Sequence, residues 1–567
     1  MFRISGISDL ISHKIKSYKI RVNLDDLRHQ RAKNKRDGAD TTTTANTMKE
    51  LFVTTIILLA SASFASAQQA IRVSLQSRAP STEKDVPAGT RVIHQEIQHW
   101  QPRETAIIIC DMWNRHWCQG ATDRVAEMAP LMNEVLTVAR EKGVTIVHAP
   151  SDTLKWYENH PARNRARQFR SPEIEKRLGG GKLAAEADAE WPIDQSDEGC
   201  DCTPSCKQGP PYPWEHQIET LTIRDEDLMS DSGIEIGSCF EEKGIKNVIL
   251  MGVHTNMCVI GRSFGLRNMS RLGMNVVLMR DLTDTMYNSK SAPYVSHFTG
   301  NSLIQEYIET YVCPSMVSCD FTGKKQFRFK EDKRPVVAFV TAENEYRTNQ
   351  RFHEFAHELL LTKGVHCDFA AGEQSIESPG RHNIENLQVL SDADLVFLSI
   401  RRRALEKEKM DLVKEYALSG KPLVGIRTAS HAFSVKEPIA DHLVTWEELD
   451  HEVWGGNYVG HLRNLSTETQ VTLVPGMENH PLLRGIDQDG FISPSWLYQC
   501  RPLSPNAQVL LIGTISGAPG EPVLWINHRP GGGKVIYTSL GHWDDWANPN
   551  FKQLMFNCVI QIIPNQP

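Results

Sequence analysis

Short apolar runs alternate with longer amphipathic stretches along most of this chain. An apolar run bounded by turn residues predicts a buried strand, whereas apolar positions repeated every three to four residues predict a helix. Alternating strands and helices with short connections are typical of parallel sheets covered by helices. In the first half of the chain, strands are predicted at residues 105–111, 144–149, 218–224, 247–251 and 275–280, and helices at residues 125–142, 233–243, 259–270 and 299–311.

A second alternating series begins at Pro335, after a charged stretch without a core pattern that we interpret as a linker. The whole pattern predicts two doubly wound, three-layer α/β/α domains with mainly parallel sheets. The predicted bounds are residues 68–320 for the first domain, with an insertion at about 151–217, residues 321–334 for the linker, and residues 335–567 for the second domain. In the second domain, strands are predicted at residues 336–340, 394–399, 422–426, 509–514 and 534–539, and helices near residues 351–362, 407–419 and 550–562.

The first 67 residues do not follow this pattern. Met48 could be the true start residue. Lys49 then supplies a charged n-region, residues 51–59 form an apolar h-region, and Ala65-Ser66-Ala67 is a small-residue cleavage site. These features predict a secretory signal peptide at residues 48–67 and make residues 1–47 a spurious N-terminal extension. The apolar run is short for a membrane span. We therefore expect an exported protein, periplasmic or extracellular, without a stable membrane anchor.

Amino-acid composition and net charge limit the kinds of molecule that this protein is expected to bind. The chain has 567 residues, of which 40% are hydrophobic and 23% are charged, and its formal net charge is -7. These values are typical of a soluble globular protein, and the acidic balance argues against nucleic-acid binding. We expect a small-molecule substrate, with a carbohydrate-linked compound as one option. Homo-oligomerisation stays open.

Two residues with reactive side chains stand where predicted strands end. Asp111 closes the first strand, and Cys258 follows the strand at residues 247–251 and its tight exit turn, and precedes a helix. Ligands bind outside the carboxyl ends of the strands in open α/β sheets. A thiol at a helix N-terminus is shifted towards the thiolate, and the free N–H groups there can hold an oxyanion. The pattern thus predicts a nucleophilic cysteine, with a buried structural cysteine as the alternative.

The turn Gly-Val-His-Thr-Asn-Met-Cys that ends at Cys258, the strand-terminal Asp111 and Asp281, and the helix at residues 299–311 resemble the isochorismatase-like cysteine hydrolases. This resemblance implies a three-layer α/β/α fold over about residues 100–312 and a triad of Asp, Lys and Cys. It also implies a cis peptide bond before His254. Asp111 and Cys258 match the triad, and Arg224 stands in the place of the lysine. A guanidinium can supply a fixed positive charge there but cannot shuttle a proton.

The same resemblance implies hydrolysis of a small amide or ureido substrate, without a catalytic metal or other cofactor. Two alternatives stay open, namely a catalytically degenerate binding or scaffold protein and an isochorismatase-type vinyl-ether hydrolase. The residues expected to line the substrate pocket are Trp113, Asn114, His116, Trp117, His254 and Thr255.

The segments at residues 425–433, 454–458 and 533–542 of the second domain are similar to those of the ThuA-like (trehalose-utilisation) family. That family has a class I glutamine-amidotransferase-like fold, and the similarity covers about residues 335–563. Amidotransferases carry a cysteine at the elbow after a strand, where this chain has Thr428 or a neighbour, so glutaminase chemistry is not expected. A polar, sugar-like pocket is expected from Thr428, His431, His461 and His542.

Three of the 12 cysteines lie within seven residues of one another, at Cys200, Cys202 and Cys206, in a loop rich in glycine and proline. Export permits disulfides, so we expect a local disulfide and one longer bridge. A zinc site that includes His216 is the alternative, although the spacing fits no standard zinc pattern. Either arrangement would have a structural role.

Overall fold

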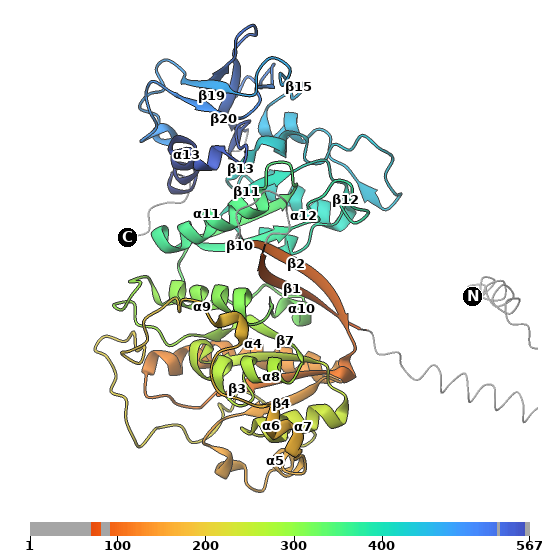
Figure 1. Ribbon diagram of the computed structural model, residues 1–567, viewed down its shortest axis with the longest axis vertical. Helices are drawn as coiled ribbons and strands as arrows, with labels where there is room; N and C mark the ends of the chain where they lie inside the picture. Colours follow the sequence, from red (N-terminus) through yellow and green to blue (C-terminus); the bar gives the residue numbers. More distant parts are fainter. Residues whose placement is uncertain (1–69, 81–90, 530–532, 562–567) are drawn as a thin grey trace, which may run out of the picture. The chain divides into compact units, whose positions relative to one another are not determined.

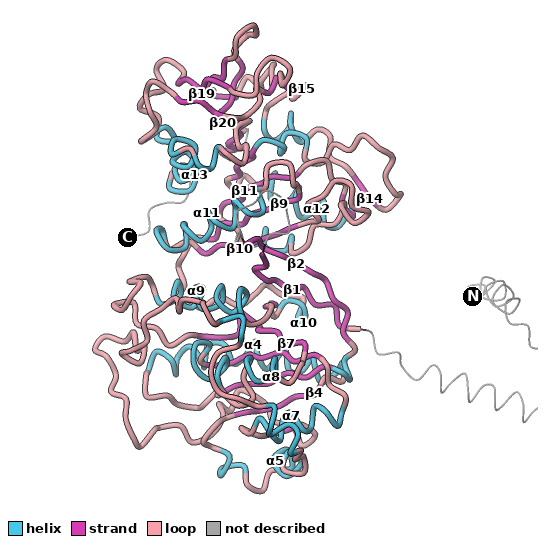
Figure 2. The backbone as a smooth tube through the Cα atoms, in the orientation of Figure 1, coloured by secondary structure: helices cyan, strands magenta, loops and turns pink. Residues whose placement is uncertain are grey.

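The computed structural model describes residues 70–80, 91–529 and 533–561, which form two large sheets flanked by helices (Figures 1 and 2). The predicted N-terminal extension and signal peptide lie outside the described residues. Among the helices that the structure describes, none is long and apolar enough to cross a membrane. The predicted fold class is confirmed, because both sheets belong to a mixed α/β architecture with parallel strands at their centres.

The first sheet has eight strands in the order β2-β1-β8-β7-β6-β3-β4-β5. All neighbours from β8 to β5 are parallel, and only the β2-β1-β8 edge is antiparallel. This order places β3 and β6 side by side near the middle of the sheet. The strands are β1 (Ile71–Pro80), β2 (Arg91–Trp100), β3 (Thr105–Cys110), β4 (Thr145–Ala149), β5 (Leu228–Met229), β6 (Asn247–Val253), β7 (Asn275–Asp284) and β8 (Ser315–Met316).

Helices cover both faces of this sheet, which explains the continuous apolar runs of its central strands. Ile107 and Ile109 of β3 pack in the core cluster that contains the apolar side of α4, whereas Ile108 and Cys110 pack in the cluster of α7, α8 and α9. Successive side chains of a strand point to opposite faces, so every position of β3 is buried. The helices are α4 (Gln119–Lys142), α5 (Pro161–Ala166), α6 (Pro172–Arg177), α7 (Gly233–Lys243), α8 (Leu266–Arg271), α9 (His297–Tyr311) and α10 (Cys319–Thr322).

Two predicted elements of the first half are wrong in detail. Residues 218–224 do not form a strand but a bent segment, whose carbonyl at Thr222 accepts a hydrogen bond of 2.8 Å from Arg140; the strand is β5, further along. The predicted helix at residues 259–270 is interrupted. It begins as a π-helical turn at Thr255–Val259, bends at Gly265, and resumes as α8.

The second sheet has nine strands in the order β10-β9-β11-β13-β21-β20-β19-β16-β17. Its first five strands are parallel, and the remainder extend it in antiparallel pairs. The sequence pattern did not predict β10, β16, β17 or β20. The strands are β9 (Val336–Ala342), β10 (His366–Ala371), β11 (Leu395–Ile400), β13 (Leu423–Ile426), β16 (Thr469–Leu473), β17 (Phe491–Ser493), β19 (Ala507–Thr514), β20 (Glu521–His528) and β21 (Lys534–Thr538).

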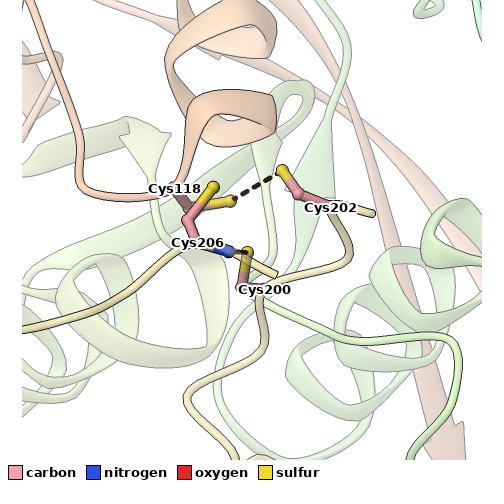
Figure 3. Close-up of side chains that lie close together, drawn as sticks. All are labelled: Cys118, Cys200, Cys202 and Cys206. Carbon is pink, nitrogen blue, oxygen red and sulfur yellow. Dashed lines mark hydrogen bonds between the residues drawn. The ribbon is translucent and has the colours of Figure 1, made fainter. Parts of the chain in front are cut away.

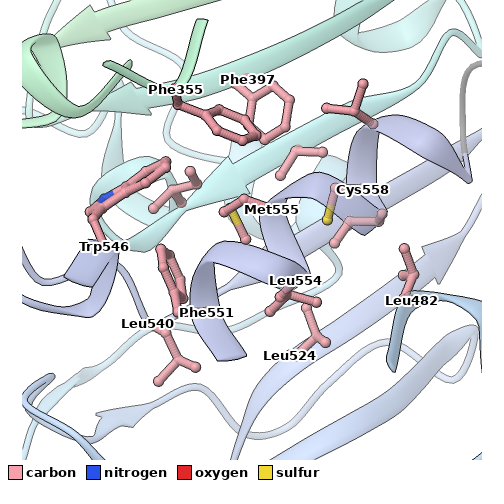
Figure 4. Packing of buried hydrophobic residues seen from close by; sticks show 14 of the residues in the cluster. Phe355, Phe397, Leu482, Leu524, Leu540, Trp546, Phe551, Leu554, Met555 and Cys558 are labelled. Carbon is pink, nitrogen blue, oxygen red and sulfur yellow. The ribbon is translucent and has the colours of Figure 1, made fainter. Parts of the chain in front are cut away.

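Helices again lie on both faces of this sheet. On one side α11 (Thr348–Lys363) and α13 (Pro549–Ile560) pack in a single core cluster, where Phe551 and Met555 of α13 lie with Phe355 of α11 and Phe397 of β11 (Figure 4). On the other side α12 (Lys407–Leu418) buries Met410. These two clusters make the second half three-layered as well.

Candidate active site

Cys258 and Asp111 meet at the carboxyl edge of the first sheet. In the sheet register, Cys110 at the end of β3 pairs with Gly252 near the end of β6, so the residues that follow these strands are neighbours. The peptide bond between Val253 and His254 is cis. The Cys258 thiol lies close enough to the Asp111 carboxylate for each group to affect the pKa of the other, and Cys258 is partly exposed. The structure thus brings together the two predicted triad members.

The backbone at this edge is held in unusual conformations. Asp111 has a φ of 47°, in the left-handed region that costs a residue other than glycine about 1–3 kcal/mol. Gly252 has a φ of 112°, and a Cβ there would lie 2.1 Å from the carbonyl oxygen of Cys110. The close approach of β6 to β3 therefore requires glycine, and the surrounding structure keeps Asp111 aimed at the thiol.

Arg262, and not Arg224, supplies the positive charge beside Asp111. Its Nε donates to one carboxylate oxygen of Asp111 at 3.1 Å, and the backbone N–H of Ser151 donates to the other at 2.7 Å. Arg262 lies one helical turn after Cys258. The Arg224 side chain lies 3.7 Å from Glu226, and both are largely exposed. The structure therefore does not bring Arg224 to the pair.

The resting thiol is protonated. Burial and, to a smaller extent, the negative Asp111 raise the pKa of Cys258 to about 12, although Arg262 partly opposes both effects. Burial also raises the pKa of Asp111, opposed by Arg262 and by the hydrogen bonds from Cys258 and Ser151. The thiolate expected from the helix N-terminus is thus not the resting form, because desolvation outweighs the favourable dipole. Asp111 is placed to receive the proton when the sulfur reacts.

An aromatic stack lies next to this pair. The rings of Trp113 and Trp214 are parallel with centroids 4.5 Å apart, Tyr212 stacks on the other side of Trp214 at 4.4 Å, and His116 lies 5.7 Å from Trp214. Tyr212 and Trp214 come from the predicted insertion, and the sequence analysis did not single them out. Burial lowers the pKa of His116 to about 4, so its imidazole is neutral.

The remaining predicted pocket residues differ in their surroundings. Trp117 packs at an angle on His116, and the side chain of Asn114 bonds to the insertion through the backbone N–H of Glu215 at 3.1 Å. His254 is buried, and its Nε2 has no hydrogen-bond partner among the described residues. Thr255 is fully buried and bonds to a neighbouring threonine behind the turn at 2.7 Å. Of these, His254 retains a polar atom that a substrate could use.

A buried charge network, which the sequence pattern did not predict, lies beside the turn at residues 254–258. Asp284, at the end of β7, accepts hydrogen bonds from Arg124 at 2.7 Å and from His297 at 2.9 Å. Burial would raise the pKa of Asp284, but Arg124 and His297 hold it well below its usual value. Asp281, which was predicted to end this strand, lies within β7, because the strand continues to Asp284; its side chain accepts a hydrogen bond from Ser318 apart from the network.

In the second half, the elbow after β13 is occupied by Arg427, which has a φ of 47° and is fully buried. Its guanidinium lies between the rings of Tyr346 and Tyr498, 4.3 Å and 4.5 Å from their centroids. Nη1 donates to the carbonyl of Ser539 at 2.7 Å, while Nε and Nη2 have no hydrogen-bond partner among the described residues. The hydroxyl of Thr428 is likewise buried without one. The elbow after β13 therefore carries the Arg427 guanidinium in place of the cysteine that amidotransferases have there.

Three predicted histidines surround this arginine through aromatic contacts. His431 stacks on Tyr458 at 4.7 Å, His461 lies 6.1 Å from Tyr498, and His542 lies 6.0 Å from Tyr346. Burial and nearby arginines lower the pKa of each of the three histidines. The arrangement is a cluster of neutral histidines and tyrosines around one buried cation.

Within the described part of the chain, four free thiols lie close enough together to hold a metal ion. Cys118, Cys200, Cys202 and Cys206 converge on one point (Figure 3). All described cysteines are free thiols in this structure, which differs from the expected local disulfide and longer bridge. His216 lies outside this group, because its Nδ1 is 2.9 Å from the backbone carbonyl of its own neighbour in the chain.

Comparison with known proteins supports the second resemblance directly. Residues 336–560 match the family model for ThuA, trehalose utilisation. No curated protein matches the chain. A putative ThuA-like protein from Parabacteroides merdae is 18% identical, with a TM-score of 0.29, and the match covers 40% of this chain and 88% of that protein.

Solved structures similar to this chain also include members of the other family. A cysteine hydrolase from Pseudomonas syringae pv. phaseolicola is 15% identical, with a TM-score of 0.25, and covers 39% of this chain and 92% of its own. An isochorismatase family protein from Burkholderia thailandensis is 11% identical, with a TM-score of 0.22, and covers 39% of this chain and 95% of its own.

Proposed function

We propose that the first half of the chain is a hydrolase that cleaves a small amide or ureido substrate with Cys258 as the nucleophile. The observation that carries this proposal is the position of Cys258 beside Asp111, a buried carboxylate held by Arg262 at the carboxyl edge of the central strands. Arg262 bonds to the same carboxylate and favours its ionised form before the reaction. The pair therefore has an acceptor ready for the thiol proton.

The proposed reaction follows from this geometry. The Cys258 sulfur attacks the carbonyl carbon while its proton passes to Asp111, because a free thiolate is unfavourable here. Backbone N–H groups of the turn at residues 254–258 hold the oxyanion. The C–N bond then breaks, and Asp111 returns the proton to the leaving nitrogen. Water attacks the thioester, gives its proton to Asp111, and releases the acid and the thiol.

Turnover of a panel of small amides and ureides tests this proposal. We expect one class of substrate to be hydrolysed by the wild type and not by Cys258→Ala, while Cys319→Ala, which alters a partly exposed cysteine elsewhere, stays active. Hydrolysis of a vinyl ether that persists in Cys258→Ala would favour the vinyl-ether alternative. A wild type that binds members of the panel and turns none over would favour the degenerate binding protein.

For the second half we propose binding of a carbohydrate-related ligand that carries an acidic group. Two unpartnered nitrogens of the buried Arg427 lie among tyrosine and histidine side chains, which suit an anion next to hydroxyl groups. Calorimetry with matched sugars and sugar acids tests this. We expect Arg427→Gln to lose the preference for the acid, and His461→Ala to weaken both ligands alike. Equal binding of neutral and acidic sugars by the wild type would contradict the role of Arg427.

Export is a further part of the proposal, supported by the signal-like pattern at residues 48–67. N-terminal sequencing of the protein recovered outside the cytoplasm should begin at Gln68. Recovery only of an uncleaved cytoplasmic chain would contradict export.

A further inference from the structure

Four thiols from two segments of the chain converge beside the candidate active site. The thiol cluster consists of Cys118, Cys200, Cys202 and Cys206, whose sulfur atoms all lie within 4.8 Å of one another (Figure 3). Cys118 directly precedes α4, and the other three belong to the loop at residues 200–206. The sulfurs of Cys118 and Cys202 are 3.7 Å apart, far beyond a disulfide bond of about 2.05 Å.

We propose that the thiol cluster binds one Zn²⁺ ion as a structural tetrathiolate site. A zinc–sulfur distance of about 2.3 Å with tetrahedral angles places neighbouring sulfurs about 3.8 Å apart. The 3.7 Å between Cys118 and Cys202 agrees with that spacing. Soft thiolates select zinc or iron over calcium and magnesium, and four protein ligands leave no open position for catalysis.

The first turn of α4 provides the charge balance that bound thiolates require. The backbone N–H of Gln119 donates to the Cys206 sulfur at 3.5 Å, and that of Gly120 donates to the Cys202 sulfur at 3.3 Å. Such N–H groups and the positive end of a helix stabilise metal-bound thiolates. Arg124, which is paired with Asp284, also lies nearby, because its Nη1 and the Cys202 sulfur are 3.0 Å and 3.3 Å from the position that a Cβ on Gly120 would take.

The chain conformation next to the cluster is consistent with a fixed site. Gly199, directly before Cys200, has a φ of 75°, and a Cβ there would lie 2.4 Å from the backbone carbonyl carbon of Met286. A side chain would therefore displace the loop. This packing fixes the start of the loop independently of the thiols and sets the position of Cys200.

The site would fasten the insertion over the candidate active site. Trp117 and Met257 pack on the thiol cluster, and Met257 directly precedes Cys258. Further along the same loop, Trp214 stacks on Trp113. A metal ion would thus hold the aromatic stack next to the reactive pair without touching the substrate, so this inference does not depend on the identity of the reaction.

Metal analysis of the full-length mature protein, purified with neither chelator nor added metal, tests the site. We expect about one zinc per chain in the wild type and in the control Cys319→Ser, a partly exposed cysteine outside the cluster. Cys202→Ser and Cys118→Ser should lose the zinc. Replacement of zinc by Co²⁺ should give the charge-transfer and d–d absorption of a tetrahedral thiolate complex, and this absorption should be missing in Cys202→Ser.

The intact mass of the same samples distinguishes the zinc site from a pair of disulfides among the four cysteines. Two disulfides would lower the mass by two hydrogens each and leave no zinc, and this result would overturn the proposal. One iron per chain in place of zinc would overturn the assignment of the metal. If Cys118→Ser does not fold, Cys206→Ser, which alters a partly exposed residue of the loop, replaces it in the test. Zinc that remains bound in both Cys206→Ser and Cys202→Ser would also overturn the proposed site.

Discussion

Replacing Asp111 by asparagine should make Cys258 a better nucleophile towards a small alkylating agent while abolishing turnover. The negative Asp111 is one cause of the raised pKa of Cys258, and Arg262, which lowers that pKa, stays in place in the variant. Asparagine can still accept the hydrogen bond from the Ser151 backbone with its side-chain oxygen. The variant therefore removes the charge and the general base with a small change in shape.

The size of the effect follows from Coulomb's law. Two unit charges 4 Å apart interact by about 4 kcal/mol at an effective dielectric constant of 20 and by about 1 kcal/mol in water. Because one pKa unit corresponds to about 1.4 kcal/mol, the Cys258 pKa should fall by about one to three units from its value near 12. A fall of about two units raises the thiolate fraction at pH 8 about 100-fold, and the lower intrinsic nucleophilicity reduces the gain to about 10-fold.

Iodoacetamide labelling of the Cys258 peptide, followed by mass spectrometry from pH 7 to 10, measures this change. The wild type should label slowly at neutral pH, and the rate should rise with pH without a plateau. Asp152→Asn is the matched control, because Asp152 is exposed and lies 3.7 Å from Arg262. Labelling of the wild type that reaches a plateau below pH 7, or a slower rate in Asp111→Asn, would refute the reasoning.

Three further predictions, two of them with a control substitution, test the surrounding structure. Arg262→Met should reduce turnover at least 10-fold, and Arg224→Met should leave it within about twofold, because only Arg262 contacts the carboxylate; equal losses in steady-state kinetics would contradict this. Gly252→Ala should lower the free energy of unfolding by about 2–4 kcal/mol in urea titration, since its Cβ meets a backbone oxygen at a positive φ. Gly261→Ala, where a Cβ meets nothing within 4 Å, should not, and similar losses in both would refute the clash. Asp284→Asn should cost about 3–5 kcal/mol at pH 7 by breaking a buried ion pair. The folded-state pKa of Asp284 is depressed, so its contribution is present above the unfolded value near ~3.9 and is lost as pH falls through the folded value. An unchanged melting temperature in Asp284→Asn at pH 7 would contradict this.

The sequence predicts the reactive pair because its information is local. Asp111 and Cys258 each follow an apolar run, and the rule that neighbouring parallel strands end at one edge brings them together. Arg262 follows Cys258 by four residues, a spacing that places two residues on one side of a helix, so the same reasoning could have found it. The apolar periodicity of the helix does not distinguish a polar side chain that reaches the reactive pair from one that faces solvent.

Contacts made by the insertion were beyond sequence reasoning. Trp214 reaches Trp113, and Cys202 reaches Cys118, across more than eighty residues without regular periodicity. Loop conformation is set by turn residues and by tertiary packing, neither of which leaves a repeating pattern. In the antiparallel half of the second sheet, β19 is predicted at residues 509–514, whereas β16 and β17 are missed because they are short strands with mixed side chains.

Trapping of a covalent intermediate tests the central claim most directly. A substrate from the amide or ureide panel is mixed with the protein, quenched in acid within one turnover, and analysed by peptide mass spectrometry. The account predicts an acyl or carbamoyl adduct on the peptide that contains Cys258, missing in Cys258→Ala and accumulating in no other cysteine peptide. Product formation without any adduct, at an unchanged rate in Cys258→Ala, would contradict the claim that Cys258 is the nucleophile.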